Sequence, residues 1–351
     1  MRRFIAILFL ITTLGTTATA QDSSEPLPSR VLLNGMDLVW QQRNRCSAAA
    51  FTMLLSYWND DASYRNSVNR FNPNSSDVSV TLDEMVAYAA TYDLRAISRM
   101  GGTTDMLKRL VANGFPVLVE NVYYDGAHNF RNWTSHNRVV VGYDDTLQVI
   151  YALDSVLGGG ASNTGRAFGY AEFEERWRPL NHNYFVIYKP EDTLRLRAII
   201  GQHWDPLYNA EWTRENVQSK LYAPERDGFD NFNLGISLSV LGEYQLAAQA
   251  FDVARVIGLP GRMMWYQFEP FEAYLQIGRT RDVFDLTRAI IAQEPGVEEM
   301  YYYIARAYLV EGNVEQAIAN LEAAVWRNPF YTDAELLLSQ VRNQVANATN
   351  D

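Results

Sequence analysis

Residues 40–50 read WQQRNRCSAAA, and the cysteine in this stretch opens an apolar run that continues to Trp58. Small and apolar residues without interruption predict a buried helix that begins at Cys46. Unpaired backbone N–H groups and the helix dipole favour negative charge at that position, so we expect a lowered thiol pKa. Arg43 and Arg45 would add to this effect if they pointed inward. Taken alone, however, a cysteine that opens an apolar helix is more often a packing residue.

Two later stretches hold polar residues at the ends of apolar runs. Residues 135–145 read SHNRVVVGYDD and residues 149–155 read VIYALDS, as expected for two strands of a hairpin. A hairpin that turns about residue 145 places His136 directly opposite Asp154, with their Cβ atoms about 4.5–5.5 Å apart. In that geometry the carboxylate holds one imidazole nitrogen and leaves the other free. A slip of one residue would put the two side chains on different faces.

A glutamine precedes the cysteine by five residues. Its side-chain amide could donate a hydrogen bond to an oxyanion, together with the backbone N–H of Cys46. Gln41 is our candidate for this role, and the neighbouring Gln42 could compete for it.

The first half of the chain mixes helix and strand signals. Thr81 and Glu84 form a capping-box pattern at the start of a predicted helix over residues 81–92. A further helix is predicted over residues 103–113, and Gly114 would end it. Strands are predicted at residues 115–119, 138–143, 147–153 and 184–188. Helices that precede an antiparallel sheet indicate an α+β domain.

The second half is a helical repeat with a period near 34 residues, which is typical of tetratricopeptide repeats. Two residue types recur at 34- to 36-residue spacing: Gly242, Gly278 and Gly312, and Pro260, Pro295 and Pro329. The copy that begins at Glu298 fits the pattern best. The second copy is degenerate, because Pro270 and Phe271 occupy sites where the first copy has Leu234 and Gly235. Residues 333–345 predict a terminal helix that caps the stack. An unrelated helical bundle is the alternative.

The first 20 residues have the pattern of an export signal. Arg2 and Arg3 precede an apolar stretch at residues 4–14, and Ala18 and Ala20 stand at the positions expected before a cut ahead of Gln21. The stretch is shorter than the roughly 20 residues of a membrane-spanning helix. We therefore expect an extracytoplasmic protein, secreted or in the cell envelope. An uncleaved anchor is the alternative.

Charge and composition limit the remaining function classes. The formal net charge of −11 at pH 7 makes nucleic acid or an anionic membrane a poor partner. The single cysteine excludes a disulfide within the chain. The four histidines are scattered without metal-ligand spacing, so the sequence predicts neither a metal nor a cofactor.

Taken together, these residues resemble the papain-like cysteine peptidases of the bacteriocin-leader (double-glycine) type and their exported relatives. The resemblance covers about residues 31–190. Its matching pieces are Gln41, Cys46, residues 54–58, His136, residues 139–145 and Asp154. It implies that Cys46 is the nucleophile, His136 the base and acid, Asp154 the residue that orients the histidine, and Gln41 the oxyanion donor. The implied chemistry is acyl transfer from a peptide or protein substrate through a thioester, without a cofactor.

One departure from the family pattern leaves alternatives open. Members usually have Gly-Pro-Ala after the cysteine, whereas this chain has Ser47, Ala48 and Ala49. Without the Gly-Pro turn, the domain could be a catalytically silent scaffold that binds protein. A related amidase or transglutaminase-like acyl transferase is also consistent with the same triad.

The sequence therefore predicts an α+β papain-like domain followed by an all-α tetratricopeptide-repeat domain. The repeats would bind a protein partner. The predicted organisation comprises an export signal at residues 1–20, a flexible leader at 21–30, the papain-like domain at 31–190, a connector at 191–227, and the repeats with their capping helix at 228–346.

Overall fold

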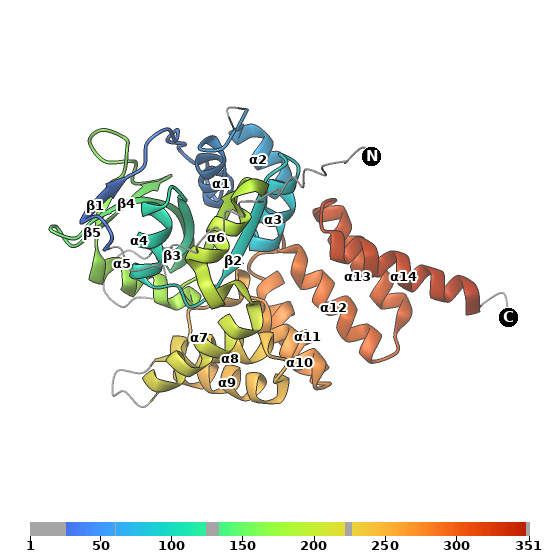
Figure 1. The fold of residues 1–351 in the computed structure, drawn as a ribbon. Helices are drawn as coiled ribbons and strands as arrows, with labels where there is room; N and C mark the ends of the chain where they lie inside the picture. The colour runs from blue at the N-terminus through green and yellow to red at the C-terminus, as the bar shows by residue number, and fades with distance from the viewer. Residues whose placement is uncertain (1–25, 60, 124–132, 222–226, 349–351) are drawn as a thin grey trace, which may run out of the picture.

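The computed structural model describes residues 26–59, 61–123, 133–221 and 227–348. The predicted export signal, including its cleavage point, lies outside the described residues. Figure 1 shows a sheet flanked by helices in the first half of the chain and a succession of helices in the second half. The predicted combination of an α+β domain with an all-α repeat domain is confirmed.

A seven-stranded sheet forms the centre of the first half, and every neighbouring pair of strands is antiparallel. Its order is β2-β7-β3-β4-β5-β6, and β1 pairs with β4 outside this path. The strands are β1 (Arg30–Leu32), β2 (Arg95–Arg99), β3 (Val117–Tyr123), β4 (Thr134–Asp144), β5 (Val149–Asp154), β6 (Arg166–Gly169) and β7 (Tyr184–Tyr188). Strand β4 begins four residues before the predicted strand at 138–143, so His136 lies within the strand.

Helices cover both faces of the sheet, because successive residues of a strand point to opposite sides. Val139 packs with α1 (Cys46–Ser56), α2 (Tyr64–Phe71) and α3 (Leu82–Ala90). Val140 belongs to the opposite core, formed with α4 (Thr104–Ala112), α5 (Tyr170–Trp177) and α6 (Thr193–Ile200).

The predicted helix starts match the structure, because they depend on local chemistry. The side chain of Thr81 accepts a hydrogen bond from the Glu84 backbone N–H, and the Glu84 carboxylate accepts one from the Thr81 N–H, which completes the capping box. Thr103 caps α4 in the same way through the Met106 N–H. Gly114 has φ 81°, the left-handed conformation that follows a helix end.

The segment between the sheet and the repeats is largely helical. It contains α6, which packs on the sheet, and α7 (Pro206–Lys220), which packs against the first repeat helix. It also contains the short 3-10 turns η3 (Pro190–Asp192) and η4 (Gly201–Trp204), while η2 (Arg178–Leu180) precedes β7 and η5 (Met263–Trp265) lies within the repeats.

The second half forms three antiparallel helix pairs and a last helix, as the repeat pattern predicts. They are α8 (Gly228–Val240), α9 (Tyr244–Ile257), α10 (Glu269–Gln276), α11 (Thr280–Ile291), α12 (Glu298–Val310), α13 (Val314–Arg327) and α14 (Thr332–Ala348). Gly242, Gly278 and Gly312 end the first helix of each pair with φ of 75°, 74° and 76°. The repeat period thus arises because the first helix of each pair ends at a glycine in the left-handed backbone conformation.

Small residues bring the paired helices together. A Cβ atom on Gly235 would lie 2.5 Å from the ring of Phe251, so only glycine allows α8 and α9 to approach this closely. In the degenerate second copy, Pro270 stands in the first turn of α10, where it needs no hydrogen-bond partner for its nitrogen.

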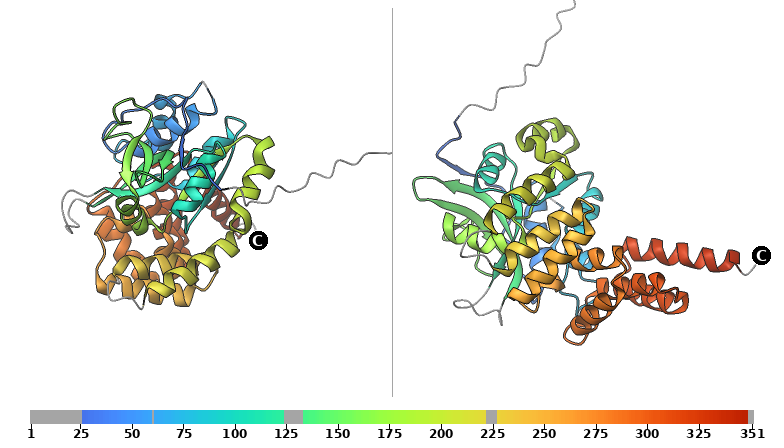
Figure 2. Two further views of the ribbon diagram at one scale, coloured as in Figure 1. Left: turned by 60° about the vertical axis from the view of Figure 1, so that its left-hand side comes forward. Right: turned by 90° about the horizontal axis from the view of Figure 1, so that it is seen from below.

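The repeats pack directly against the first half of the chain. Trp133 and Leu180 share one apolar core with Phe229 and other repeat residues. Arg178 forms ion pairs with Asp227 and Asp230 at the start of α8. Figures 1 and 2 show α8 to α11 beneath the sheet and α12 to α14 beyond α3. Within the described ranges, no helix combines the length and apolarity needed to cross a bilayer.

Candidate active site

Cys46 is the first residue of α1, and its side chain is partly exposed. The rest of the helix is buried from Ser47 to Leu55, so the packed helix holds the thiol at the edge of the core. Among the residues that the structure describes, no side chain caps this helix end. The N–H groups of its first turn are therefore available to a negative charge at or near the sulfur.

Two neighbouring residues of β4 interact with the thiol. The Asn137 amide donates a hydrogen bond to Cys46 Sγ at 3.9 Å and another to Ser47 Oγ at 3.0 Å. Burial opposes ionisation of the thiol, but the hydrogen bond and charge of His136, with the Asn137 contacts, outweigh burial and lower the Cys46 pKa. The geometry therefore favours a thiolate.

His136 links the thiol to a carboxylate. Its Nε2 lies 3.1 Å from Asp154 Oδ1, and the ring is buried. Burial works against the charged imidazolium, but hydrogen bonds with Asp154 and Cys46 raise the His136 pKa to about 9. Because His136 Nε2 is hydrogen-bonded to Asp154, Nδ1 is the ring nitrogen that can exchange a proton with the thiol. A lowered Cys46 pKa and a raised His136 pKa together describe a thiolate–imidazolium pair.

Asp154 is completely buried, and both of its carboxylate oxygens accept hydrogen bonds. Oδ1 also accepts the backbone N–H groups of Val156 and Leu157, each at 2.8 Å, and Oδ2 accepts Arg138 Nε at 2.7 Å. Burial opposes ionisation, but the His136 hydrogen bond and charge, then Arg138, hold the Asp154 pKa well below its usual range. The carboxylate is therefore fixed and charged.

The predicted register of the hairpin is wrong, although the predicted neighbours do meet. Asp154 pairs directly with Arg138, and His136 lies two residues further along the same face. Near the turn the pairing is Asp144 with Val149, and it shifts between Val140 and Gly142. The register error thus comes from a bulge that the alternation of apolar residues does not reveal.

This bulge decides which face His136 occupies. If the pairing near the turn continued without a shift, Val139 would lie opposite Asp154, and His136 would point to the other side of the sheet. The bulge adds one residue to β4, and this extra residue returns His136 to the face of the sheet that carries Asp154. Gly142 follows the bulge, where a Cβ would lie 2.5 Å from the Val31 carbonyl oxygen of β1.

Gln41 lies beside the Asp154 segment. Its N–H donates to the Ser155 carbonyl at 3.1 Å, and its Oε1 accepts the Ser155 hydroxyl at 2.7 Å. The amide NH₂ is left as the donor end. Among the described residues, no hydrogen bond joins Gln41 to Cys46. Gln42 is exposed, and its backbone N–H donates to the Tyr64 hydroxyl.

Within the described part of the chain, no hydrogen bond joins either arginine before the cysteine to the thiol. Arg43 is exposed, while the buried Arg45 guanidinium donates to the carbonyl oxygens of Asn44, Ser75 and Asp77. Arg45 therefore ties the loop before α3 to the start of α1. The tight turn into α1 is made before the cysteine by Asn44, which has φ 56°. Ser47 stands where the family pattern has glycine, and its hydroxyl oxygen accepts a hydrogen bond from the Asn137 amide.

Sequence reasoning missed three residues of this cluster: Asn137, Arg138 and Ser155. Arg138 could have been found, since it follows His136 by two residues and shares its face in a strand. Nothing local marked Asn137 or Ser155, whose partners come from distant segments. Among the described residues, no group of three or more His, Cys, Asp or Glu side chains could hold a metal ion.

Comparisons with known proteins bear on the first half of the chain. Residues 33–184, less than half of the chain, match the model of the Peptidase_C39 like family. The resemblance predicted for this part is confirmed. A search of curated proteins found no match.

A search of solved structures also found matches of low identity. A protein described as a C39-like peptidase from Bacillus anthracis is 16% identical, with a TM-score of 0.37, and the match covers 46% of this chain and 98% of that one. MamA 41-end from Desulfovibrio magneticus RS-1 is 20% identical, with a TM-score of 0.36, and the match covers 40% and 79% of the two chains.

Proposed function

We propose that the protein is a cysteine peptidase that cleaves peptide bonds through Cys46, His136 and Asp154. The observation that carries the proposal is the position of His136 between the thiol and a buried carboxylate. This arrangement supplies a charged nucleophile, a proton donor for the leaving group and a fixed orientation of the imidazole.

The proposed reaction proceeds in two halves. The Cys46 thiolate attacks the peptide carbonyl carbon, an S–C bond forms, and the carbonyl electron pair moves to oxygen. His136 then gives its proton to the amide nitrogen as the C–N bond breaks, which leaves a thioester and a free amine. Water next attacks the thioester while His136 takes its proton. The C–S bond breaks and the thiolate is restored.

Oxyanion stabilisation would come from the start of α1 and from Gln41. The Cys46 backbone N–H belongs to the unpaired first turn of the helix. Ser155 occupies Gln41 Oε1 and leaves the amide NH₂ to donate. Two such donors stabilise the negative oxygen of the tetrahedral intermediate.

The repeats and the N-terminal residues complete the proposal. The repeat array would bind a protein partner or substrate, since stacked helix pairs present extended surfaces for protein contacts. The signal-like residues 1–20 would send the peptidase out of the cytoplasm.

Alkylation of Cys46 by iodoacetamide near pH 6.5 tests the catalytic proposal. We expect the native thiol to react at least about tenfold faster than the thiol of His136→Ala, because the imidazolium stabilises the thiolate. His203→Ala is the matched control, since this histidine lies in η4 among α7 residues. Equal rates in all three proteins would favour a silent scaffold. A reactive thiol that hydrolyses amide donors but no peptide in a library would favour the amidase.

A further inference from the structure

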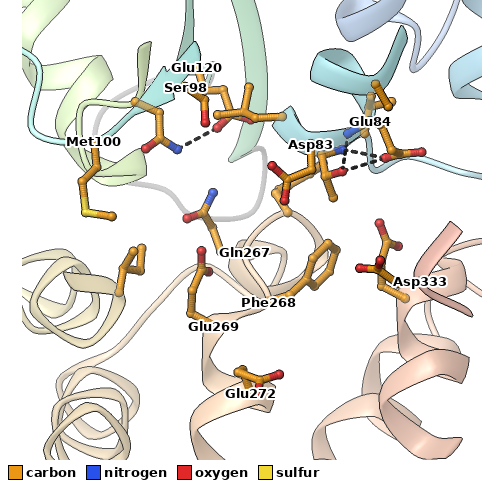
Figure 3. Close-up of a pocket in the computed structure, with 18 of the residues that line it drawn as sticks. Asp83, Glu84, Ser98, Met100, Glu120, Gln267, Phe268, Glu269, Glu272 and Asp333 are labelled. Carbon is orange, nitrogen blue, oxygen red and sulfur yellow. Dashed lines mark hydrogen bonds between the residues drawn. The ribbon is translucent and has the colours of Figure 1, made fainter. Parts of the chain in front are cut away.

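A cavity of about 790 Å³ lies between the sheet and the repeats (Figure 3). One wall comes from the first half of the chain, including Ser98 on β2, Glu120 on β3 and Asp83 in the first turn of α3. The other wall comes from the repeats, including Glu269 on α10 and Asp333 on α14. The cavity exists only because the two halves pack together.

The lining of the cavity is strongly acidic. Its carboxylates are Asp83, Glu84, Glu120, Glu269, Glu272, Glu299 and Asp333, and the only cations that the described residues add to the lining are Arg70 and Arg99. The Arg99 guanidinium is engaged by backbone carbonyl oxygens, among them that of His203. Arg70 lies over the ring of Phe330, 4.3 Å from its centroid. Neither arginine forms an ion pair with a carboxylate among the described residues.

Four of these carboxylates extend from the mouth of the cavity to its floor. Asp83 and Asp333 are exposed, Glu269 is partly buried, and Glu120 is 7% exposed. None of the four forms an ion pair within the described part of the chain. Glu120 accepts one hydrogen bond, from the Asn183 amide, and Glu269 Oε2 accepts none there. These four carboxylates therefore form a row that offers many hydrogen-bond acceptors and few hydrogen-bond donors.

Two buried polar side chains point to a ligand. Gln267 is 6% exposed, and Figure 3 shows its amide in the cavity between Glu120 and Glu269. No hydrogen bond joins this amide to another described residue. Glu299 also lines the cavity, is 3% exposed, and has an Oε2 without a partner in the described residues. Buried polar groups normally have partners, so a bound molecule would satisfy them.

The floor of the cavity adjoins the candidate active site. Glu120 pairs directly with Asn137 across β3 and β4, and Asn137 contacts Cys46 Sγ. Tyr266 lines the cavity as well, and its hydroxyl lies 3.0 Å from Thr134 Oγ1 on β4. A peptide that reached Cys46 could therefore place a neighbouring side chain in this space.

We infer that the cavity is a subsite for a basic residue, lysine or arginine, of the peptide that the enzyme binds. The inference rests on the proposed function. An ammonium or guanidinium group carries only donors and positive charge, and the unpaired carboxylates lack both. A long flexible side chain also suits a row of acids that runs inward from the surface. Within the described residues these acids do not converge to hold a metal ion.

The raised pKa values of two cavity carboxylates support this assignment. Burial and the neighbouring Glu269 charge raise the Glu120 pKa to about 7, although the Asn183 hydrogen bond opposes the shift. Burial, with the Asp83 charge, also raises the Glu269 pKa. The other charged side chains that line this space in the described residues are Arg70 on α2, Glu84 on α3, Arg99 on β2, Glu272 on α10, Glu299 on α12 and Asp333 on α14. A bound cation would restore the ionised carboxylates, so binding would release protons and strengthen from pH 6 to pH 8.

Calorimetric titration of the full chain carrying Cys46→Ala tests the subsite without turnover. The probe is acetyl-Gly-Lys-Lys-Gly-Gly-amide, and its reference is the same peptide with glutamine at both lysine positions. We expect the lysine peptide to bind at least tenfold more tightly. Glu120→Gln and Glu269→Gln should each weaken its binding by about tenfold, the usual loss for a hydrogen bond to a charged group. Glu315→Gln, which changes an exposed acid on α13, should have no effect.

Three outcomes would overturn the inference. They are equal binding of the two peptides, an equal loss from Glu315→Gln, or binding of spermidine that depends on Glu120 while the lysine peptide does not bind. The last result would assign the cavity to free polyamines. Thermal unfolding of each variant shows whether it folds, and two separate glutamine variants keep the test decisive. An unreactive Cys46 would refute the proposed peptidase while leaving peptide binding measurable, because the titrated protein lacks the thiol.

Discussion

At the scale of single residues, the chemistry of the site depends on one buried carboxylate with four hydrogen bonds. Asp154 binds His136 through Oδ1 and Arg138 through Oδ2, and the backbone of the following turn completes its shell. Asp154 therefore both orients the imidazole and helps to raise the His136 pKa, to which the hydrogen bond and charge of Cys46 also contribute. A change at Asp154 should alter proton transfer more than substrate binding.

Replacement of the carboxylate by its amide tests this dependence. Asp154→Asn should lower the His136 pKa from about 9 by about one to two units, because the opposite charge is lost. The alkaline limb of the pH profile of kcat/KM should move down accordingly, and kcat should fall at least about tenfold. Asp144→Asn, at the turn end of the same hairpin, is the control and should leave the limb in place. An unmoved limb in Asp154→Asn would show that another group controls it.

At the scale of elements, glycine acts in two physically different ways. Gly142 and Gly235 are needed because another part of the chain lies too close for a Cβ atom. Gly242, Gly278 and Gly312 have nothing within 4 Å of a built Cβ, and their requirement is the left-handed φ near 75°. The regular spacing of the three turn glycines therefore follows from the backbone conformation that each turn requires. At Gly142 and Gly235, by contrast, glycine is required because a larger side chain would not fit.

Substitutions at Gly312 test whether the turn requires glycine for its backbone conformation or for lack of space around a side chain. Gly312→Ala should reduce the free energy of unfolding by about 1 kcal/mol, because alanine is strained in the left-handed region. Gly312→Asn should reduce the free energy of unfolding by less, since asparagine tolerates the left-handed region. Urea unfolding measures both, with Gly261→Ala as a control at a glycine that has open space around it and no positive φ. Equal losses for alanine and asparagine would contradict the conformational explanation.

The packing of β1 on the bulged strand makes a second prediction at this scale. Gly142→Ala should destabilise the protein by about 1–3 kcal/mol, because the new methyl group meets the Val31 carbonyl oxygen and the Leu32 side chain. The thiol of the folded variant should also react more slowly, since β4 carries His136 and Asn137. Thermal unfolding and iodoacetamide alkylation measure the two effects. A variant as stable and as reactive as the native protein would rule out this role for Gly142.

At the scale of the whole molecule, the two halves meet through buried acids. The Asn328 amide donates to Glu84 Oε1 on α3 at 3.0 Å and to Glu298 Oε1 on α12 at 2.7 Å. Burial and the nearby Glu84 charge raise the Glu298 pKa to about 8. Gly296 adds a close backbone contact, since a Cβ there would lie 2.2 Å from the Ser76 carbonyl oxygen. The interface is therefore tight and most favourable when its carboxyls are neutral.

Stability should accordingly fall as pH rises from about 5 to 8. Glu120 and Glu298 have folded pKa values near 7 and 8 against ordinary values of 4.5. In that window the unfolded chain ionises first, so the folded state binds more protons and the free energy of unfolding decreases with pH. Glu298→Gln should flatten the decline and raise the melting temperature at pH 8, whereas Glu315→Gln should not. Melting curves from pH 5 to 8 would refute this if the Glu298→Gln protein kept the native slope.

The sequence by itself determined the features that depend on neighbouring residues. The capping box at Thr81, the cysteine at the start of a helix, the alternating faces of the strands and the glycine-marked repeat could all be predicted. These follow from backbone hydrogen bonding and residue conformation over a few positions.

Only the tertiary structure decided the hairpin register, the donors around Cys46 and the acidic cavity. The bulge after Val140 depends on how β4 pairs with β5 and packs against β1. Asn137 and Arg138 acquire their partners through that pairing. The cavity unites side chains from opposite halves of the chain. Contacts between distant segments depend on the packing of the whole molecule, which leaves no periodic signal in any one stretch.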